Sequence, residues 1–332
     1  MYIVTGGAGF IGSAVIWKLN SMGIDDILVV DNLSTSEKWK NLVNRRYADY
    51  MHRDAFIDLA ERDALGNDIT AIIHMGARSA TSERDADFLM RNNLAYSKTL
   101  CLYAKKKNAR FINASSAATY GNGSLGFSDD AGGPDRADAA DTLDALRPLN
   151  MYGYSKHLFD LWAQKNGHLD NLASLKFFNV YGPNEQHKGE MRSVINKAFH
   201  QIRKSGRMRL FRSTVPDYAD GGQMRDFVYI KDCAEIMWWL LENPTANGIF
   251  NLGTGTARTW NDLARAVFAA MKLPGRIEYM DMPAELAGSY QNFTKARMER
   301  LRAAGYSAPM YSLEQGITEY VQYYLEAPDP HL

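Results

Sequence analysis

The sequence has few cysteines, no excess of either charge and no long apolar stretch. Cys101 and Cys233 are too few for a disulfide framework, so we expect a protein of the reducing cytoplasm. Lys plus Arg and Asp plus Glu both number 38, and this balance argues against a nucleic-acid-binding function. No apolar stretch approaches the ~20 residues that cross a bilayer, and the basic start of a signal peptide is missing. We therefore expect a cytoplasmic protein with neither nucleic acid nor membrane as its partner.

The remaining composition is that of a globular α/β protein. The chain has 332 residues, of which 46% are hydrophobic and 23% are charged, which suggests two domains or one domain with an added lobe. In the first half, short apolar stretches alternate with helical periodicity. We predict strands at 2–5, 27–31, 71–74, 111–114 and 174–180, and helices at 10–22, 85–107 and 152–166. This alternation predicts a doubly wound parallel sheet of the Rossmann type.

The second half is less regular, and we expect a smaller α/β lobe there. The predicted dinucleotide-binding domain covers residues 1–178, and the mainly substrate-binding lobe covers 179–332. We expect some later segments, about 226–256, to return to the first domain. Helices are predicted at 191–205, 232–242, 262–272 and 312–324, a strand at 249–252, and loops at 122–147 and 216–223.

A glycine-rich turn follows the first predicted strand. Gly6, Gly9 and Gly12 stand at three-residue intervals, which suits a tight turn, a close pyrophosphate and close helix–strand packing. The next helix begins at Phe10 and Ile11, so its free N–H groups and positive dipole would face the phosphates. A glycine pattern alone is weak evidence, but the strand before it and the helix after it predict dinucleotide binding.

The sequence leaves the choice of nicotinamide cofactor open. Asp31 closes the second predicted strand, where an acid usually binds a ribose 2′-hydroxyl and so favours NAD. Lys38 and Arg53 follow closely and could hold the 2′-phosphate of NADP instead.

Tyr152 and Lys156 form a candidate catalytic pair. They stand four residues apart in a predicted helix and therefore share one face. A free tyrosine, with a pKa of ~10, is a poor base at neutral pH, and a lysine about 4 Å away would lower that pKa. Ser116 closes what we expect to be the fourth strand, at the carboxyl edge where such sheets bind ligands, and its hydroxyl can bridge the tyrosine and a substrate oxygen.

Together these three motifs resemble the extended short-chain dehydrogenase/reductase superfamily, in its nucleotide-sugar epimerase branch. The resemblance implies that Tyr152 is the catalytic acid/base, Lys156 its pKa-lowering and ribose-binding partner, and Ser116 the third member. Nucleotide-sugar dehydratases of similar sequence carry an Asp-Glu pair beside the catalytic Ser or Thr. Here Ala117 and Ala118 stand in that place, so an elimination reaction is not expected.

Within this branch the chain resembles the ADP-L-glycero-D-manno-heptose 6-epimerases over almost its whole length. The matching segments are 29–33, 48–50, 149–156, 187–189, 225–229, 248–255 and 301–306. The departures are a longer loop at 122–147, and Glu190 and Lys197 in place of Ser and His. The resemblance implies epimerisation of ADP-heptose at the exocyclic C6″ through a ketone, in lipopolysaccharide inner-core heptose synthesis.

The same resemblance assigns site residues. It makes Lys188 a second acid/base opposite Tyr152, although the residues alone favour an exposed charge or a phosphate ligand. The resemblance implies NADP as the cofactor, with NAD as the alternative, and no metal. It also implies a homo-oligomer, namely a pentamer. The implied cofactor-binding residues are Gly6, Gly9, Phe10, Ile11, Gly12, Asp31, Asn32, Lys38, Arg53, Met75, Gly76, Ala77, Arg78, Ser79, Asn92, Lys156, Val180 and Lys188. The implied substrate-binding residues are Asn179, Glu190, Lys197, Phe211, Arg212, Ser213, Arg225 and Tyr290.

Some of these assignments have alternatives. Arg212 and Arg225 are planar multi-donor cations that suit a diphosphate, whereas Tyr290 could equally be a core aromatic. A UDP-hexose 4-epimerase would share the first half of the chain but not the loop that carries Lys188. A dinucleotide-sensing regulatory protein is the alternative without enzyme activity, and such proteins usually lose the tyrosine or the lysine.

Overall fold

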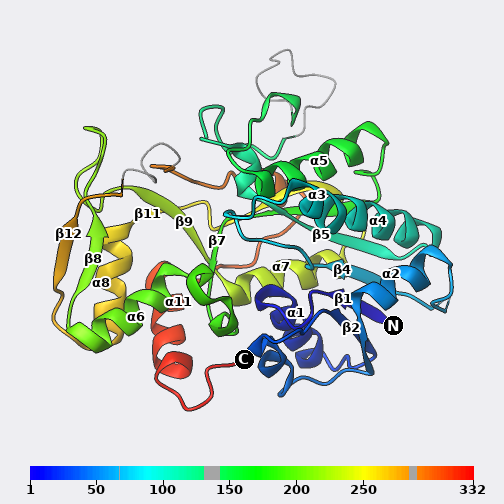
Figure 1. Ribbon diagram of the computed structural model, residues 1–332, viewed down its shortest axis with the longest axis horizontal. Helices are drawn as coiled ribbons and strands as arrows, with labels where there is room; N and C mark the ends of the chain where they lie inside the picture. The colour runs from blue at the N-terminus through cyan, green and yellow to red at the C-terminus, as the bar shows by residue number, and fades with distance from the viewer. Residues whose placement is uncertain (67, 131–142, 284–289) are drawn as a thin grey trace.

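The computed structural model describes residues 1–66, 68–130, 143–283 and 290–332 (Figure 1). Its centre is a seven-stranded parallel sheet in the order β10-β6-β5-β4-β1-β2-β3. The strands are β1 (Tyr2–Thr5), β2 (Ile27–Asp31), β3 (Asp49–His52), β4 (Ala71–His74), β5 (Arg110–Ser116), β6 (Leu172–Phe177) and β10 (Gly248–Leu252). The predicted doubly wound parallel sheet is confirmed.

Helices cover both faces of this sheet (Figure 1). Successive strand residues point to opposite faces, and both faces are apolar, which explains the continuous apolar strands. Ile3 lies in the core beside Phe56 and Leu100, whereas the next residue, Val4, lies in the core beside Ile16. One face carries α1 (Phe10–Ser21) and α7 (Ile230–Glu242), and the other carries α2 (Arg53–Glu61), α4 (Tyr96–Lys106) and α5 (Met151–Lys165).

A smaller lobe lies at the left of Figure 1. Its three-stranded sheet has the order β11-β9-β7, and a parallel pair joins β12 to β8. The lobe consists of β7 (Asn179–Tyr181), α6 (Val194–Ser205), β8 (Met208–Phe211), β9 (Met224–Tyr229), β11 (Ala257–Thr259), α8 (Trp260–Ala270), β12 (Ile277–Met280) and α11 (Leu313–Tyr320). α8 packs against both α6 and α11.

Short helical segments connect these elements. They are η1 (Glu37–Leu42), α3 (Ala86–Leu89), η2 (Met90–Ala95), η3 (Ala117–Tyr120), η5 (Leu143–Ala145), η6 (Gln186–Met191), α10 (Glu299–Ala303) and η7 (Val321–Leu325). The predicted helix at 85–107 therefore comprises α3, the π-helical turn η2 and α4.

Two strand predictions need correction. The single strand expected at 174–180 is two strands, because the chain leaves the large sheet after Phe177 and pairs with β9 from Asn179. The short edge strand β3 was not predicted, since Asp49 and His52 are exposed polar residues. Ser116 consequently closes the fifth strand in chain order, not the fourth. Of the loop expected at 122–147, residues 131–142 lie outside the described part of the chain.

The described residues include no helix long and apolar enough to cross a membrane. Among the same residues, no group of three or more His, Cys, Asp or Glu side chains is arranged to hold a metal ion. Cys101 in α4 and Cys233 in α7 are buried free thiols.

Candidate functional site

The glycine-rich turn between β1 and α1 has no room for larger residues at two positions. Gly6 has a φ of 65°, and a β-carbon there would lie 2.6 Å from the backbone nitrogen of Gly76. A β-carbon on Gly12 would lie 2.1 Å from the Gly6 carbonyl oxygen. A β-carbon on Gly9 would lie 3.0 Å from the Gly6 carbonyl oxygen, so this position is also tight, and Gly9 itself is half-buried. The turn therefore forms a cradle that a phosphate can approach closely.

The first turn of α1 completes this cradle. The Ser13 N–H donates to the Gly9 carbonyl oxygen at 3.0 Å, and it is the first backbone bond of the helix. The N–H groups of Phe10, Ile11 and Gly12 precede it and have no preceding turn to bond to. These N–H groups and the helix dipole fit an anionic pyrophosphate.

Asp31 and Lys38 form an ion pair beside the turn. One carboxylate oxygen of Asp31 accepts the N–H of Ala8 at 2.8 Å. The other accepts the N–H of Asn32 at 2.6 Å and the Lys38 ammonium at 2.6 Å. The structure thus brings Asp31, Asn32 and Lys38 together, with the charge of Asp31 compensated by Lys38.

Arg53, at the start of α2, lies beside Asn92. Its guanidinium donates a hydrogen bond to the Asn92 side-chain oxygen and is 3.2 Å from the Asp54 carboxylate. Asn92 in turn donates to the side chain of Asn93 at 2.8 Å. The predicted residues Arg53 and Asn92 are therefore adjacent, and they lead to a residue that the sequence analysis missed.

That residue is Asn93, which is fully buried. Its amide exchanges hydrogen bonds of 2.9 and 3.0 Å with the backbone of Arg78, and it donates to the Ser155 hydroxyl at 3.0 Å. Asn93 thus joins the segment after β4 to helix α5. Its position next to Asn92 was the only signal in the sequence.

The segment after β4 lies directly beside the glycine-rich turn. The Met75 N–H donates to the Thr5 carbonyl at 3.0 Å, and Gly76 is in van der Waals contact with Gly6. Met75, Gly76 and Ala77 are half-buried, whereas Arg78 and Ser79 are exposed. Met75 and Gly76 therefore lie against the glycine-rich turn, and the other three predicted residues follow them in the chain.

Tyr152 meets Ser116 because α5 begins against the end of β5. The Asn150 side chain caps α5 by accepting the Gly153 N–H at 2.8 Å. A β-carbon on Gly153 would lie only 2.7 Å from the Ala118 carbonyl oxygen, so glycine permits this close approach. The Ser116 hydroxyl lies close enough to the Tyr152 phenol to act on its pKa.

The acid–base properties of the pair differ from the sequence prediction. Burial raises the pKa of Tyr152, and the nearby Ser116 hydroxyl only partly opposes this rise. Burial also lowers the pKa of Lys156 to about 8. In the protein alone the pKa of Tyr152 is raised, and its lowering by Lys156 stays a prediction for the cofactor-bound site. Dehydration disfavours the charged forms of both groups, and this cost outweighs the opposing effects of Ser116 on Tyr152 and of Asp160 on Lys156.

Lys188 lies at the glycine-rich turn. Its ammonium is 5.0 Å from the centre of the Phe10 ring, burial lowers its pKa, and the nearby Glu185 carboxylate raises it. The Asn41 side chain connects the loop to the turn by donating to the carbonyls of Ala8 at 2.9 Å and Asn184 at 3.1 Å. Asn41 gave no signal in the sequence, because its partners are far away in the chain.

Three predicted substrate residues gather in the smaller lobe. The Arg225 guanidinium lies 5.1 Å from the centre of the Tyr290 ring and 5.6 Å from that of Trp260. The Tyr290 and Phe211 rings lie 6.5 Å apart, and the Trp260 indole donates to the Tyr290 hydroxyl at 2.8 Å. Trp260 is thus a member of this group that the sequence analysis missed.

The other predicted substrate residues are more dispersed. Glu190 and Lys197, the two departures from the resembled family, form an ion pair with a 3.4 Å separation. Arg212 is 3.8 Å from the Asp281 carboxylate, and the Ser213 hydroxyl donates to the Val215 carbonyl at 2.7 Å. Asn179 is exposed at the start of β7, and Val180 follows it half-buried.

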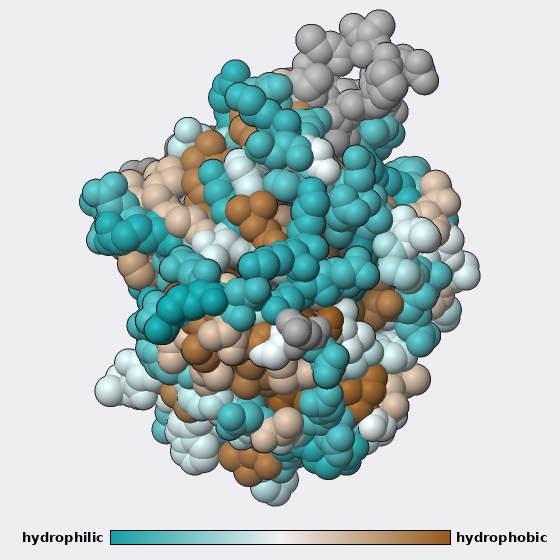
Figure 2. Space-filling view, turned by 90° about the vertical axis from the view of Figure 1, so that its right-hand side faces the viewer, coloured by the Kyte–Doolittle hydropathy of each residue, from teal (hydrophilic) through white to brown (hydrophobic). Residues whose placement is uncertain are grey.

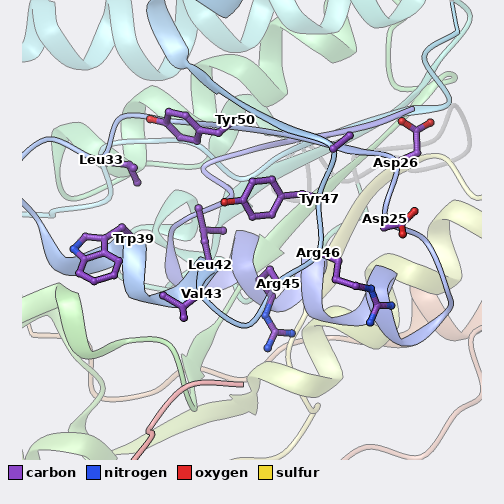
Figure 3. A pocket seen from close by; sticks show the side chains of 11 residues that line it. Asp25, Asp26, Leu33, Trp39, Leu42, Val43, Arg45, Arg46, Tyr47 and Tyr50 are labelled. Atoms are coloured by element: carbon purple, nitrogen blue, oxygen red, sulfur yellow. The ribbon is translucent and has the colours of Figure 1, made fainter.

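A cavity of about 960 Å³ lies along the β2–β3 side of the sheet (Figure 3). Its lining includes Leu33, Trp39, Tyr47 and Tyr50, and none of the predicted catalytic residues. Tyr50 connects it to the cofactor side by donating to the Asp31 carbonyl at 2.9 Å. On the side of the molecule turned to the viewer in Figure 2, hydrophilic and hydrophobic residues are interspersed.

Comparisons with known proteins agree with this geometry. Residues 2–253 match the model of the NAD dependent epimerase/dehydratase family. The ADP-L-glycero-D-manno-heptose-6-epimerase of Nitratidesulfovibrio vulgaris strain Hildenborough is 67% identical over 332 residues, which is 100% of both chains. The enzyme of the same name from Fusobacterium nucleatum is 46% identical over 340 residues, again covering 100% of both.

Solved structures show the same fold. The Helicobacter pylori ADP-L-glycero-D-manno-heptose-6-epimerase superposes with a TM-score of 0.78 at 25% identity, covering 97% of this chain and 95% of that one. A UDP-glucose 4-epimerase from Thermotoga maritima gives a TM-score of 0.75 at 24% identity, covering 97% of both chains. This chain therefore belongs to the NAD dependent epimerase/dehydratase family of enzymes.

Proposed function

We propose that the protein converts ADP-D-glycero-D-manno-heptose to ADP-L-glycero-D-manno-heptose by inverting C6″. The full-length relative that is 67% identical bears that enzyme's name. The observation that carries the proposal is the neighbouring pair of Tyr152 and Ser116, with a buried Lys156 on the same helix face as Tyr152. This arrangement suits proton transfer at a hydroxyl that becomes a carbonyl.

The cofactor in this proposal is NADP, with NAD as the alternative. When bound, this cofactor would supply a reversible hydride acceptor for the oxidation and reduction of C6″. The cradle of Gly6, Gly9 and Gly12 would hold the pyrophosphate. Because Lys38 compensates the charge of Asp31 at 2.6 Å, a second anion is less strongly repelled there, which supports a 2′-phosphate beside Lys38 and Arg53.

Tyr152 and Lys188 divide the proton transfers in this proposal. The exocyclic C6″ can present either face after rotation of the side chain, so each face needs an acid/base group. Tyr152 would exchange its proton with the C6″ oxygen beside the Ser116 hydroxyl. Lys188, whose pKa burial lowers, would serve the other face.

The substrate would lie between the site residues of the large-sheet domain and those of the smaller lobe. Arg225, held between Trp260 and Tyr290, suits the diphosphate because its planar guanidinium offers several donors. We include in the proposal a place in lipopolysaccharide inner-core heptose synthesis and a homo-oligomeric assembly, a pentamer.

Incubating the purified protein with each ADP-heptose epimer tests the proposal. We expect either epimer to give the same mixture of the two, resolved by chromatography, without net consumption of added cofactor. UDP-glucose and UDP-galactose serve as the matched substrates of a hexose 4-epimerase. Interconversion of these two, with both ADP-heptoses unchanged, would replace the proposed function by that alternative. Cofactor binding without turnover of any of the four would favour a sensing protein.

A further inference from the structure

A buried charge cluster lies directly behind the catalytic pair. Helix α5 carries Tyr152, Lys156 and Asp160 at four-residue intervals, so all three share one face. Lys156 is 2% exposed, and Asp160 is fully buried. Burial of an ionised carboxylate is costly unless it is hydrogen-bonded and compensated, so its partners indicate what it does.

Asp160 joins α5 to two strands of the large sheet. One carboxylate oxygen accepts the Ser115 hydroxyl at 2.6 Å, and the other accepts the Ser174 hydroxyl at 2.8 Å. Ser115 precedes Ser116 in β5, and Ser174 lies in the neighbouring strand β6. The carboxylate therefore has a fixed position relative to both Ser116 and Lys156.

A second buried lysine shares this carboxylate. Lys176 of β6 is fully buried, its ammonium is 4.0 Å from Asp160, and it lies 4.2 Å from the centre of the Tyr120 ring. Among the residues that the structure describes, the Lys176 ammonium has no hydrogen-bond partner. Burial lowers the pKa of Lys176 to about 8, as it does for Lys156, and Asp160 raises both values.

Of the titratable groups that surround the cluster, Asp160 is the carboxylate that acts on Lys156. Burial lowers the pKa of His74 on β4 to about 3 and also lowers that of His157 on α5, so both are neutral near pH 7. Burial raises the pKa of Asp129 to about 6, and this carboxylate acts on Lys176. Among the described residues, further titratable or charged groups near the cluster are Tyr120, Asp144, Arg147, Tyr152, Arg297 and Arg300.

We propose that Asp160 is a positioning residue that keeps Lys156 in its ammonium form, with Ser115 and Ser174 holding the carboxylate and Lys176 competing for its charge. This inference rests on the proposed function, in which Tyr152 is an acid/base group and Lys156 its buried neighbour on the same helix face. A Lys156 cation at that position would stabilise the Tyr152 phenolate. The neutral amine could not do so, and activity would therefore fall at the pH where Lys156 loses its proton.

Asp160→Asn tests the proposal because asparagine keeps the shape and can still bond to both serines. In wild-type and variant holoenzyme, the titration of Lys156 is followed by NMR of isotope-labelled lysine and assigned with Lys156→Arg. We expect the midpoint of Lys156 to fall by about one to three pH units. The alkaline limb of kcat should fall with it, while Asp160→Glu should restore both.

Two further variants separate charge from packing. Ser115→Ala removes a hydrogen bond but no charge, and should leave the Lys156 midpoint within a few tenths of a unit of wild type. Lys176→Met removes the competing cation, and should move the midpoint to higher pH. If Asp160→Asn does not fold, Lys176→Met decides by the same titration, and an unchanged or lower midpoint there contradicts the proposal.

The outcomes distinguish this inference from the proposed function. An unchanged Lys156 midpoint in folded Asp160→Asn, with kcat reduced equally at every pH, would mean a merely structural role and overturn the inference. A shifted midpoint in a protein that does not turn over ADP-heptose would support the inference about Lys156 and overturn only the proposed function.

Discussion

The ammonium of Lys38 lies 2.6 Å from the Asp31 carboxylate that also holds the N–H groups of Ala8 and Asn32. In the proposed cofactor site, this ion pair would place a cation beside the ribose 2′-substituent of the dinucleotide. An acid at this position usually favours NAD, but an acid already paired with lysine does not reject a phosphate as strongly.

Replacing Lys38 and Arg53 together with alanine should weaken NADP binding much more than NAD binding. Each charge-assisted hydrogen bond to the 2′-phosphate should contribute roughly 1.5–3 kcal/mol. Titration of both cofactors by calorimetry measures the difference. Lys40→Ala, which removes a half-buried lysine of the same η1 segment that pairs with Glu37, is the control. Equal weakening of both cofactors would return the preference to NAD through Asp31.

Tyr152→Phe should abolish epimerisation while leaving the fold and cofactor binding intact. Loss of a positioned acid/base group typically lowers the rate by ~10²–10⁴-fold. The matched control is Tyr154→Phe, because Tyr154 lies on the same helix but is 43% exposed. Turnover measured with each ADP-heptose epimer checks the prediction, and normal turnover by Tyr152→Phe would exclude this phenol as the acid/base.

Lys188→Met should lower kcat with little change in KM. A group that acts in the transition state changes kcat, whereas a phosphate ligand binds ground and transition states alike and changes mainly KM. Lys204→Met, at an exposed lysine near the end of α6, is the control for loss of a charge. The Lys188 ammonium lies against Phe10 at the glycine-rich turn, where it could also bind a phosphate. The test must therefore separate an effect on kcat from an effect on KM.

An analogue with an aldehyde at C6″ extends this test, since it starts at the oxidised level. Two molecules of the aldehyde, one of them hydrated, would disproportionate to one acid and one alcohol. The rate of this reaction should fall in each single variant, Tyr152→Phe or Lys188→Met. The double variant should be nearly inactive. Full kcat with only a raised KM in Lys188→Met would leave Tyr152 to serve both faces.

Gly153→Ala should separate α5 from the end of β5. The new β-carbon would lie 2.7 Å from the Ala118 carbonyl oxygen, so one of the two segments must shift. We expect a stability loss of about 1–3 kcal/mol in denaturant unfolding and a reduced kcat, because Tyr152 moves away from Ser116. Gly275→Ala, where the β-carbon meets nothing within 4 Å, is the control.

Asp129→Asn should change how stability depends on pH. Burial raises the pKa of Asp129 from 3.8 to about 6, so the folded state binds its proton more tightly than the unfolded state. The resulting stabilisation is complete below the unfolded pKa and is lost as pH rises through about 6. In urea unfolding, the free energy of unfolding of Asp129→Asn should no longer decline over this pH range. The control Asp217→Asn, at an exposed carboxylate, should show the same decline as wild type. The same slope in Asp129→Asn and wild type would contradict the assignment.

The features that the sequence determined by itself are local ones. Both faces of the large sheet are covered, so its central strands are continuously apolar and could be recognised without knowing their partners. The glycine spacing at Gly6, Gly9 and Gly12 and the shared helix face of Tyr152 and Lys156 also depend only on backbone geometry over a few residues. These patterns were sufficient to predict the doubly wound sheet and the candidate catalytic pair.

The tertiary structure decided what depends on segments far apart in the chain. Asn93 and Asn41 have site contacts only because folding brings β4, α5, the glycine-rich turn and the Lys188 loop together. Phe178 separates two strands and does not lie within one, because the residues that follow it pair with β9. Above all, the acid–base character of Tyr152 and Lys156 follows from burial. Helix periodicity places the two side chains on one face, but only the packing around them determines how much water they lose and which charge they can hold.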